Sequence, residues 1–170
     1  MEKIKKKVIV VGEPSVGKTT LTQMYCSNGA EFRKEYLMTQ VSDIASKIVS
    51  LEDDKDVELF FFDLSGKELY RNPVNKLMKS ADFCIYVYDS TNQDSFTQIK
   101  EWATLVKKNA GKNLPGLLVS TKNDLTSLKT VESRTGQDAA SKLEVQFYEF
   151  NPQNYQGLDE ALGSLGRKSI

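Results

Sequence analysis

A glycine-rich segment between an apolar run and a helical pattern constrains the fold of this 170-residue chain more than any other feature. Gly12–Thr19 reads GEPSVGKT, which fits the pattern G-x-x-x-x-G-K-[S/T]. It follows Lys7–Val11, whose continuous apolar run predicts a buried strand, and it opens a helix expected over Lys18–Ser27. A chance glycine-rich turn would match in only on the order of 1% of chains this long at ~7% glycine. The segment therefore predicts a strand, a phosphate-binding loop and a helix in succession.

The rest of the chain alternates apolar, β-branched runs with helical patterns, which predicts a mostly parallel sheet with helices on both faces. We expect six strands, at Lys7–Val11, Ser42–Leu51, Val57–Asp63, Phe83–Tyr88, Gly116–Ser120 and Val145–Phe150. The turn-forming residues Glu52–Asp56 suit a hairpin, so one strand should be antiparallel. Helices are expected at Lys18–Ser27, Asp94–Asn109, Val131–Leu143 and Leu158–Leu165, with an aperiodic loop at Ala30–Gln40. Leu64–Lys79 is weakly helical, and Pro73 should break it near the middle.

Charge and composition narrow the chemistry. The chain has 23 basic and 23 acidic residues, so no overall field attracts nucleic acid or anionic lipid, and we expect no nucleic-acid partner. The basic cluster Lys3–Lys7 is interpreted as a solvated lead-in to the first strand. Histidine is absent, which excludes His-based zinc sites and Ser-His or Cys-His nucleophiles. Phosphoryl transfer needs no imidazole and is compatible with this composition. The length fits one domain over residues 1–170.

The sequence also indicates an intracellular location. Cys26 and Cys84 lie in apolar surroundings and are expected to be free, buried thiols. The N-terminus has no apolar signal region, and no run approaches the roughly 20 apolar residues that span a bilayer. Glu2 does not fit a myristoylation site, and no cysteine follows Cys84. We expect a cytoplasmic protein without a lipid anchor.

The glycine-rich loop has residues suited to a nucleotide triphosphate. Backbone N–H groups of such a loop and the N-terminus of the next helix bind phosphate oxygens. Lys18 would reach the β and γ phosphates in a catalytic role, and the Thr19 hydroxyl would coordinate Mg²⁺. The residues expected around the nucleotide here are Gly12, Glu13, Pro14, Ser15, Val16, Gly17, Lys18, Thr19 and Thr20.

Two further motifs follow later strands. Thr121–Asp124 (TKND) fits [N/T]-K-x-D, and a carboxylate at Asp124 can accept from guanine N1–H and the exocyclic amine together. The stem of Lys122 can cover the base. Asp63–Gly66 (DLSG) fits D-x-x-G, so Asp63 would hold Mg²⁺ through water and the Gly66 N–H would meet the γ-phosphate. Alone, TKND is a weak signal that a solvated loop could also carry. About 100 residues after the first motif, it predicts GTP or GDP with Mg²⁺ as ligands.

On these motifs the chain resembles the Ras superfamily of small GTPases, a P-loop NTPase (G domain) fold. Within it, the chain is most similar to Rab-like GTPase subunits of the intraflagellar transport B complex. This similarity rests on Phe32–Thr39, Val57–Tyr70, Tyr88–Phe96 and Leu114–Leu125. The resemblance implies that Thr19 and Thr39 bind Mg²⁺ directly and that Phe32 packs edge-on against guanine. It also implies two nucleotide-dependent switch segments, Ala30–Gln40 and Leu64–Lys79.

The same resemblance implies a place in the cell and a partner. The partner would be a small jelly-roll subunit of the same complex, and the location a cilium or flagellum. The resemblance leaves two alternatives open: a membrane-traffic switch outside cilia, or a structural subunit that holds GTP without turning it over. An ATP-using P-loop kinase is a third possibility, against which Asp124 argues.

The chain departs from the family pattern at three places. Lys67 stands where active relatives carry the glutamine that orients water, and an ammonium cannot accept a hydrogen bond. We therefore expect intrinsic hydrolysis slower than the roughly 10⁻⁴ s⁻¹ of Ras. Pro14 stiffens the phosphate-binding loop. The third base-contacting segment, Asn151, Pro152 and Gln153, should lose one hydrogen bond because Pro152 has no N–H, unless the alignment shifts by one residue.

Overall fold

The computed structural model describes residues 3–27, 42–51, 55–67, 71–153 and 157–168. They form a six-stranded sheet with the order β2-β3-β1-β4-β5-β6. The strands are β1 (Lys3–Val11), β2 (Ser42–Ser50), β3 (Asp56–Leu64), β4 (Phe83–Asp89), β5 (Gly116–Thr121) and β6 (Gln146–Glu149). Among the strands of these described segments, only β2 is antiparallel, to β3, as expected from the hairpin pattern.

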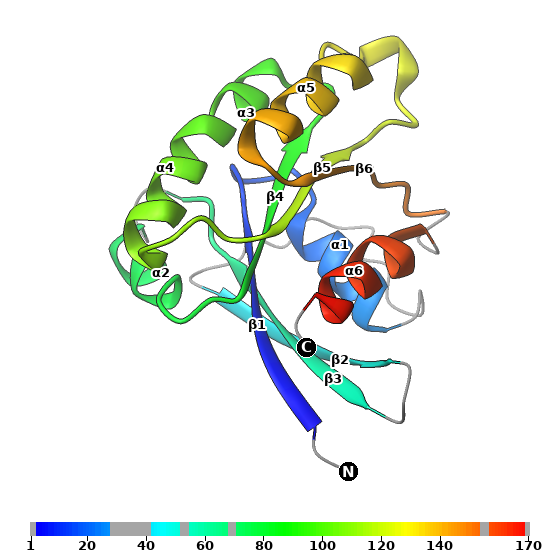
Figure 1. The fold of residues 1–170 in the computed structure, drawn as a ribbon. Helices are drawn as coiled ribbons and strands as arrows, with labels where there is room; N and C mark the ends of the chain where they lie inside the picture. The colour runs from blue at the N-terminus through cyan, green and yellow to red at the C-terminus, as the bar shows by residue number, and fades with distance from the viewer. Residues whose placement is uncertain (1–2, 28–41, 52–54, 68–70, 154–156, 169–170) are drawn as a thin grey trace.

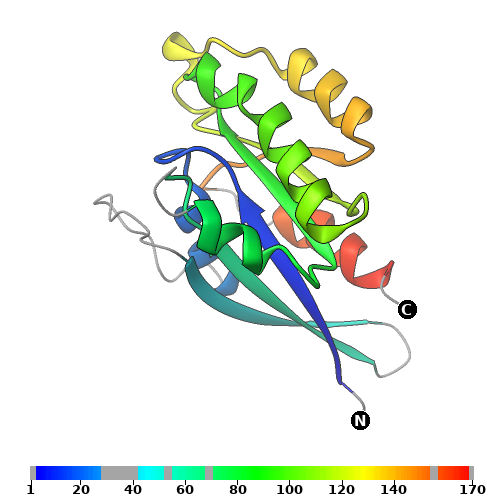
Figure 2. The ribbon, with the colours of Figure 1, turned by 90° about the vertical axis from the view of Figure 1, so that its left-hand side faces the viewer.

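Helices cover both faces of this sheet (Figure 1). They are α1 (Lys18–Cys26), α2 (Arg71–Leu77), α3 (Gln93–Thr97), α4 (Ile99–Ala110), α5 (Ser133–Leu143) and α6 (Gly157–Arg167), with a short 3₁₀ turn at Thr126–Leu128. Helices α1 and α6 lie on one face, and α2 to α5 lie on the other (Figures 1 and 2). The predicted α/β fold with a mostly parallel six-stranded sheet is therefore confirmed.

The alternation of side chains along β1 explains the two cores. Val8 and Val10 point to the face of α1 and α6, whereas Ile9 and Val11 point to the face of α2 and α4. All four valine and isoleucine side chains are fully buried. Residues of β4 are buried along its whole length, because a central parallel strand is covered on both sides. This double coverage is the reason for the continuous apolar runs in the sequence.

Several expected boundaries were wrong. Strand β1 begins at Lys3, so the cluster Lys3–Lys7 forms part of the strand, since it pairs with β3 from Asp56 onward. Pro73 does not break a helix but lies in the first turn of α2, where a backbone N–H would have no helical acceptor. The helix expected at Asp94–Asn109 is two helices, α3 and α4, that meet at Gln98.

Other features agree with expectation. Ile99, Trp102 and Val106 of α4 are buried, at the spacing that places them on one face of the expected helix. Both cysteines are free thiols, with Cys84 buried and Cys26 partly buried. Within the described ranges, no helix combines the length and apolar character that a membrane span requires.

Candidate nucleotide-binding site

Those predicted site residues that the structure describes converge at one end of the sheet, where parallel strands β1, β3, β4 and β5 have their carboxyl ends. Strand β1 lies between β3 and β4. The helix that follows β1, α1, packs on one face of the sheet, and the helices that follow β4, α3 and α4, pack on the other face. Open α/β sheets bind ligands at such a reversal of strand order. The loop after β1 and the loops after β3 and β5 carry the three motifs found in the sequence.

The phosphate-binding loop is shaped by two glycines. Gly12 lies so close to β4 that a Cβ there would come within 2.3 Å of the Val87 carbonyl oxygen. Gly17 has φ of 101°, a left-handed conformation that favours glycine, and it is the N-cap residue of α1. The loop thus turns directly into the N-terminus of α1, whose unpaired N–H groups can meet an anion.

The side chain of Lys18 lies inside the phosphate-binding loop and bonds to its backbone. Its side chain is buried, and Nζ donates to the carbonyl oxygens of Gly12 at 3.0 Å and Glu13 at 2.7 Å. Burial lowers the pKa of Lys18 to about 8, and the nearby carboxylates of Asp63 and Glu13 oppose this shift. An ammonium group buried at the mouth of a glycine loop fits an anionic phosphate ligand.

Thr19 and the D-x-x-G segment meet beside this lysine. The Thr19 hydroxyl donates to the buried carboxylate of Asp63 at the end of β3. A hydroxyl and a carboxylate are the hard oxygen donors that Mg²⁺ accepts, so this pair fits the predicted ion. Gly66 packs against the loop: a Cβ there would lie 2.4 Å from Gly12 O and 2.6 Å from the backbone of Glu13. Phe32 and Thr39, predicted for the base and the ion, lie outside the described residues.

A cavity of about 200 Å³ opens beside the phosphate-binding loop and the first turn of α1, which contributes Thr20. It joins residues of the phosphate loop, the loop after β5 and the loop after β6. The lining residues are Val16, Gly17, Thr20, Thr121, Lys122, Asp124, Leu125, Phe150 and Pro152. Asp124 is exposed at this cavity, where its carboxylate can accept from a ligand. Asn151 and Gln153 flank Pro152, and the Gln153 N–H donates to Asn151 Oδ1 at 2.9 Å.

Side-chain contacts hold these loops together. Thr121 Oγ1 donates to Val16 O at 2.5 Å, and Lys122 Nζ donates to Ser15 O at 3.1 Å. Lys122 Nζ also forms an ion pair with Asp89 Oδ2 at 2.6 Å. Sequence reasoning assigned Lys122 to the base alone and missed Asp89. The signal available was the position of Asp89 at the end of β4, on the edge where the other motifs meet.

Sequence reasoning also missed a contact of Glu13. The indole Nε1 of Trp102, in α4, donates to Glu13 Oε1 at 2.9 Å. Trp102 is 1% exposed and packs in the core between α4 and the sheet. No local pattern indicates this bond, because the two residues are far apart in the chain.

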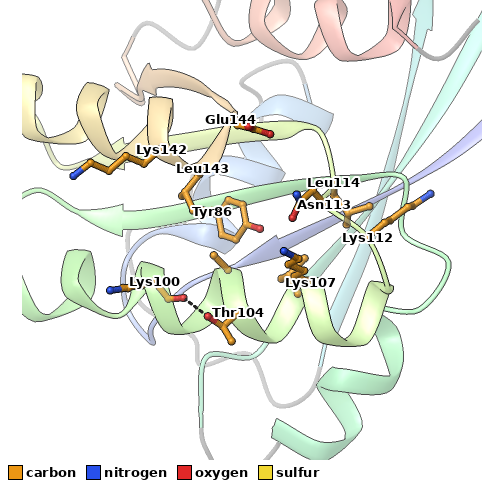
Figure 3. A pocket seen from close by; sticks show the side chains of 12 residues that line it. Tyr86, Lys100, Thr104, Lys107, Lys112, Asn113, Leu114, Lys142, Leu143 and Glu144 are labelled. Carbon is orange, nitrogen blue, oxygen red and sulfur yellow. Dashed lines mark hydrogen bonds between the residues drawn. The ribbon is translucent and has the colours of Figure 1, made fainter.

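A second cavity, of about 330 Å³, contains none of the predicted site residues. It lies between α4 and the end of α5, and the buried side chains of Tyr86 and Leu114 are among those that line it (Figure 3). Lys100, Lys107 and Lys112 are among its lining residues. Residues of the phosphate-binding loop and of the motif Thr121–Asp124 instead line the smaller cavity.

The fold and this site define a P-loop nucleotide-binding domain. The Ras family model matches residues 7–170, and the chain belongs to the Ras family. It is 41% identical over 151 residues to the intraflagellar transport protein 27 homolog of Mus musculus, covering 88% of this chain and 81% of that protein. The homolog of Trypanosoma brucei brucei is 34% identical over 170 residues, covering 100% of this chain and 92% of that protein. The Ras-related protein RABD2b of Arabidopsis thaliana is 30% identical over 159 residues, covering 94% of this chain and 77% of that protein.

Proposed function

We propose that this chain is a Rab-like GTP- and GDP-binding protein that needs Mg²⁺ and works as a subunit in intraflagellar transport. The observation that carries the nucleotide part is the shared cavity of Val16, Thr20, Lys122 and Asp124 beside the phosphate loop. The transport part is supported by the intraflagellar transport protein 27 homologs, which match 88% to 100% of the chain.

In this proposal each residue binds or positions one part of the ligand. Lys18 and the loop Gly12–Gly17 bind the phosphates, and the Gly66 N–H meets the terminal one. Thr19 and Thr39 would bind Mg²⁺ directly, and Asp63 would hold the ion through a water molecule. The ion, when bound, neutralises charge on the phosphates. Phe32, Asn151, Pro152 and Gln153 complete the base site around Asp124.

Guanine selection is tested by Asp124→Ala. The carboxylate accepts from two donors of guanine that adenine does not present as a pair, so its loss should abolish discrimination between GDP and ADP. The measurement is titration calorimetry with both nucleotides, together with mass spectrometry of the nucleotide that co-purifies. Asp138→Ala is the matched control, because Asp138 is an exposed carboxylate of α5 outside the site. A wild-type preference for adenine nucleotides would refute the proposal.

We propose further that hydrolysis is slow because Lys67 cannot aim the attacking water. The backbone N–H of Lys67 donates to Ser65 Oγ at 3.3 Å, directly after the D-x-x-G glycine that contacts the phosphate loop. Lys67→Gln supplies both an acceptor and a donor and should raise single-turnover GTP hydrolysis. A wild-type rate above that of the Lys67→Gln variant would contradict this assignment.

The partner and location follow the family resemblance and the relatives. We propose a small jelly-roll subunit of the intraflagellar transport B complex as partner and the cilium or flagellum as location. A constitutive GTP-bound subunit is the second candidate, and Lys67 is the residue that favours it. Measuring the partner's affinity with GDP and with a non-hydrolysable GTP analogue separates a switch from a constitutive subunit. A partner that binds both nucleotide states equally cannot respond to the nucleotide.

A further inference from the structure

We propose that Glu13 and Trp102 form a positioning pair that holds the phosphate loop and keeps the Glu13 carboxylate away from the nucleotide phosphates. This inference rests on the proposed nucleotide site; it adds Trp102, which lies outside the site's motifs, and gives a role to the side chain of Glu13, which belongs to the phosphate-binding loop. Trp102 is a positioning residue, because it reaches the ligand only through Glu13.

The bond between the two side chains joins distant segments. Trp102 Nε1 donates to Glu13 Oε1 at 2.9 Å, across 89 residues of sequence. The indole is 1% exposed and packs in the core between α4 and the sheet, so its position is fixed by the fold. A buried indole N–H needs an acceptor, and a charged acceptor makes a stronger bond than a neutral one.

Glu13 is also held through its main chain. Its carbonyl oxygen accepts from Lys18 Nζ at 2.7 Å, the lysine expected to reach the β and γ phosphates. Its carbonyl carbon lies against Gly66, where a Cβ would come within 2.6 Å. Glu13 therefore contacts Lys18, Gly66 of the D-x-x-G segment, and Trp102 of α4. A shift of the Glu13 backbone would therefore act on both Lys18 and Gly66.

The negative charge of Glu13 is unfavourable for phosphate binding unless the carboxylate points away from the phosphates. A carboxylate inside a phosphate-binding loop repels the ligand, and the repulsion grows as the distance to the phosphates falls. Glu13 lines a cavity together with Pro14 and with Asn92, Asp94 and Ser95 of the α3 side. It does not line the cavity of Asp124. The indole bond thus keeps the carboxylate on the α3 and α4 side of the loop.

Two substitutions separate the bond from the charge. Trp102→Phe keeps an aromatic ring but removes the donor, so the carboxylate is released with its charge. Glu13→Gln keeps an acceptor for the indole and removes the charge. We expect Trp102→Phe to release GDP about tenfold faster, which corresponds to about 1.4 kcal/mol. Glu13→Gln should release GDP more slowly than Trp102→Phe, because it keeps the indole bond and carries no charge that repels the phosphates. The double variant should recover most of the loss that Trp102→Phe causes.

A control and a second readout distinguish the possible failures. Val106→Ala loosens the same helix at a buried position without touching the loop, so its GDP release should stay at the wild-type rate. The chain has one tryptophan, so its indole N–H gives a single NMR resonance, which Glu13→Ala should shift with or without nucleotide. An unmoved resonance would show that the bond is absent in solution.

Three further outcomes would overturn the proposed function, the positioning role of Trp102 or the role of the Glu13 charge. If the wild-type protein binds no guanine nucleotide but the resonance shifts, the proposed function fails and the Glu13–Trp102 bond stands as a structural contact only. If it binds GDP and Trp102→Phe releases it at the wild-type rate, the positioning role is overturned. If the double variant releases GDP as fast as Trp102→Phe, the charge has no part in the effect.

Discussion

The ion pair between Lys122 and Asp89 allows a quantitative prediction, because one lysine supports two loops of the site. Its Nζ lies 2.6 Å from Asp89 Oδ2 and 3.1 Å from Ser15 O. The Asp89 side chain is 7% exposed and that of Lys122 is 39% exposed. Exposed pairs contribute about 0.2–1 kcal/mol, and breaking a buried pair costs about 3–5 kcal/mol.

We expect the Lys122→Met substitution to fall between these limits. Asp89 keeps hydrogen bonds from the Thr91 N–H at 2.8 Å and the Thr91 hydroxyl at 2.6 Å, so its charge is not left without a donor. Lys122 is more than a third exposed, and solvent screens its charge. Together these facts indicate a loss of about 1–2 kcal/mol in the free energy of unfolding. For a chain of this size the melting temperature should fall by about 3–6 °C.

Differential scanning calorimetry of Lys122→Met, Asp89→Asn and the double variant measures this loss and the coupling between the two side chains. The coupling should shrink in 1 M salt, where the Debye length is about 3 Å. GDP should also dissociate faster from Lys122→Met, because Ser15 loses its donor. Lys129→Met is the control: its pair with Glu149 is longer, at 3.6 Å, and lies outside the nucleotide cavity. Additive losses at Lys122 and Asp89 would refute the reasoning.

Three further predictions concern single positions. Gly12→Ala places a Cβ 2.3 Å from Val87 O, so we expect it to lower the free energy of unfolding by about 1–3 kcal/mol in urea; an unchanged midpoint would contradict the packing. Pro152→Ala supplies an N–H beside the base cavity and should tighten GDP binding by up to about tenfold in calorimetry, whereas weaker binding would argue against this contact. Burial raises the pKa of Cys26 to about 11 and raises the pKa of Cys84 well above its usual range. Both thiols therefore stay protonated at pH 8, and mass spectrometry should find the folded protein unlabelled by iodoacetamide and the unfolded protein labelled twice.

The parts of the fold that the sequence predicted are those with a local cause. Buried parallel strands need continuous apolar runs, so β4 and β5 were found almost to the residue. The first half of β1 was missed because its lysines carry no such run, and it becomes a strand only by pairing with β3. Pro73 was misjudged because its effect depends on its place in the helix, which the flanking residues did not indicate.

In the site, too, the features with a local cause could be predicted from the sequence and the long-range contacts could not. The three motifs could be predicted because each is a short segment whose backbone geometry and donors depend on neighbouring residues. The contacts of Asp89 with Lys122 and of Glu13 with Trp102 join segments 33 and 89 residues apart, and they depend on which strands are neighbours in the sheet. Strand order was not part of the prediction, so the partners of these side chains could not be inferred.

These long-range contacts all hold the phosphate-binding loop, so a nucleotide-dependent change is expected elsewhere in the chain. The loop Glu13–Val16 is held by Trp102 at its start, by Lys122 at Ser15 and by Thr121 at Val16. A loop fixed from several elements is pre-organised and has little freedom to respond to the loss of one phosphate. We therefore expect hydrogen exchange of the loop peptide to be the same with GDP and with a GTP analogue, and any difference to appear in other segments. Faster exchange of this loop in the GDP form would show that these contacts yield to the ligand and do not fix it.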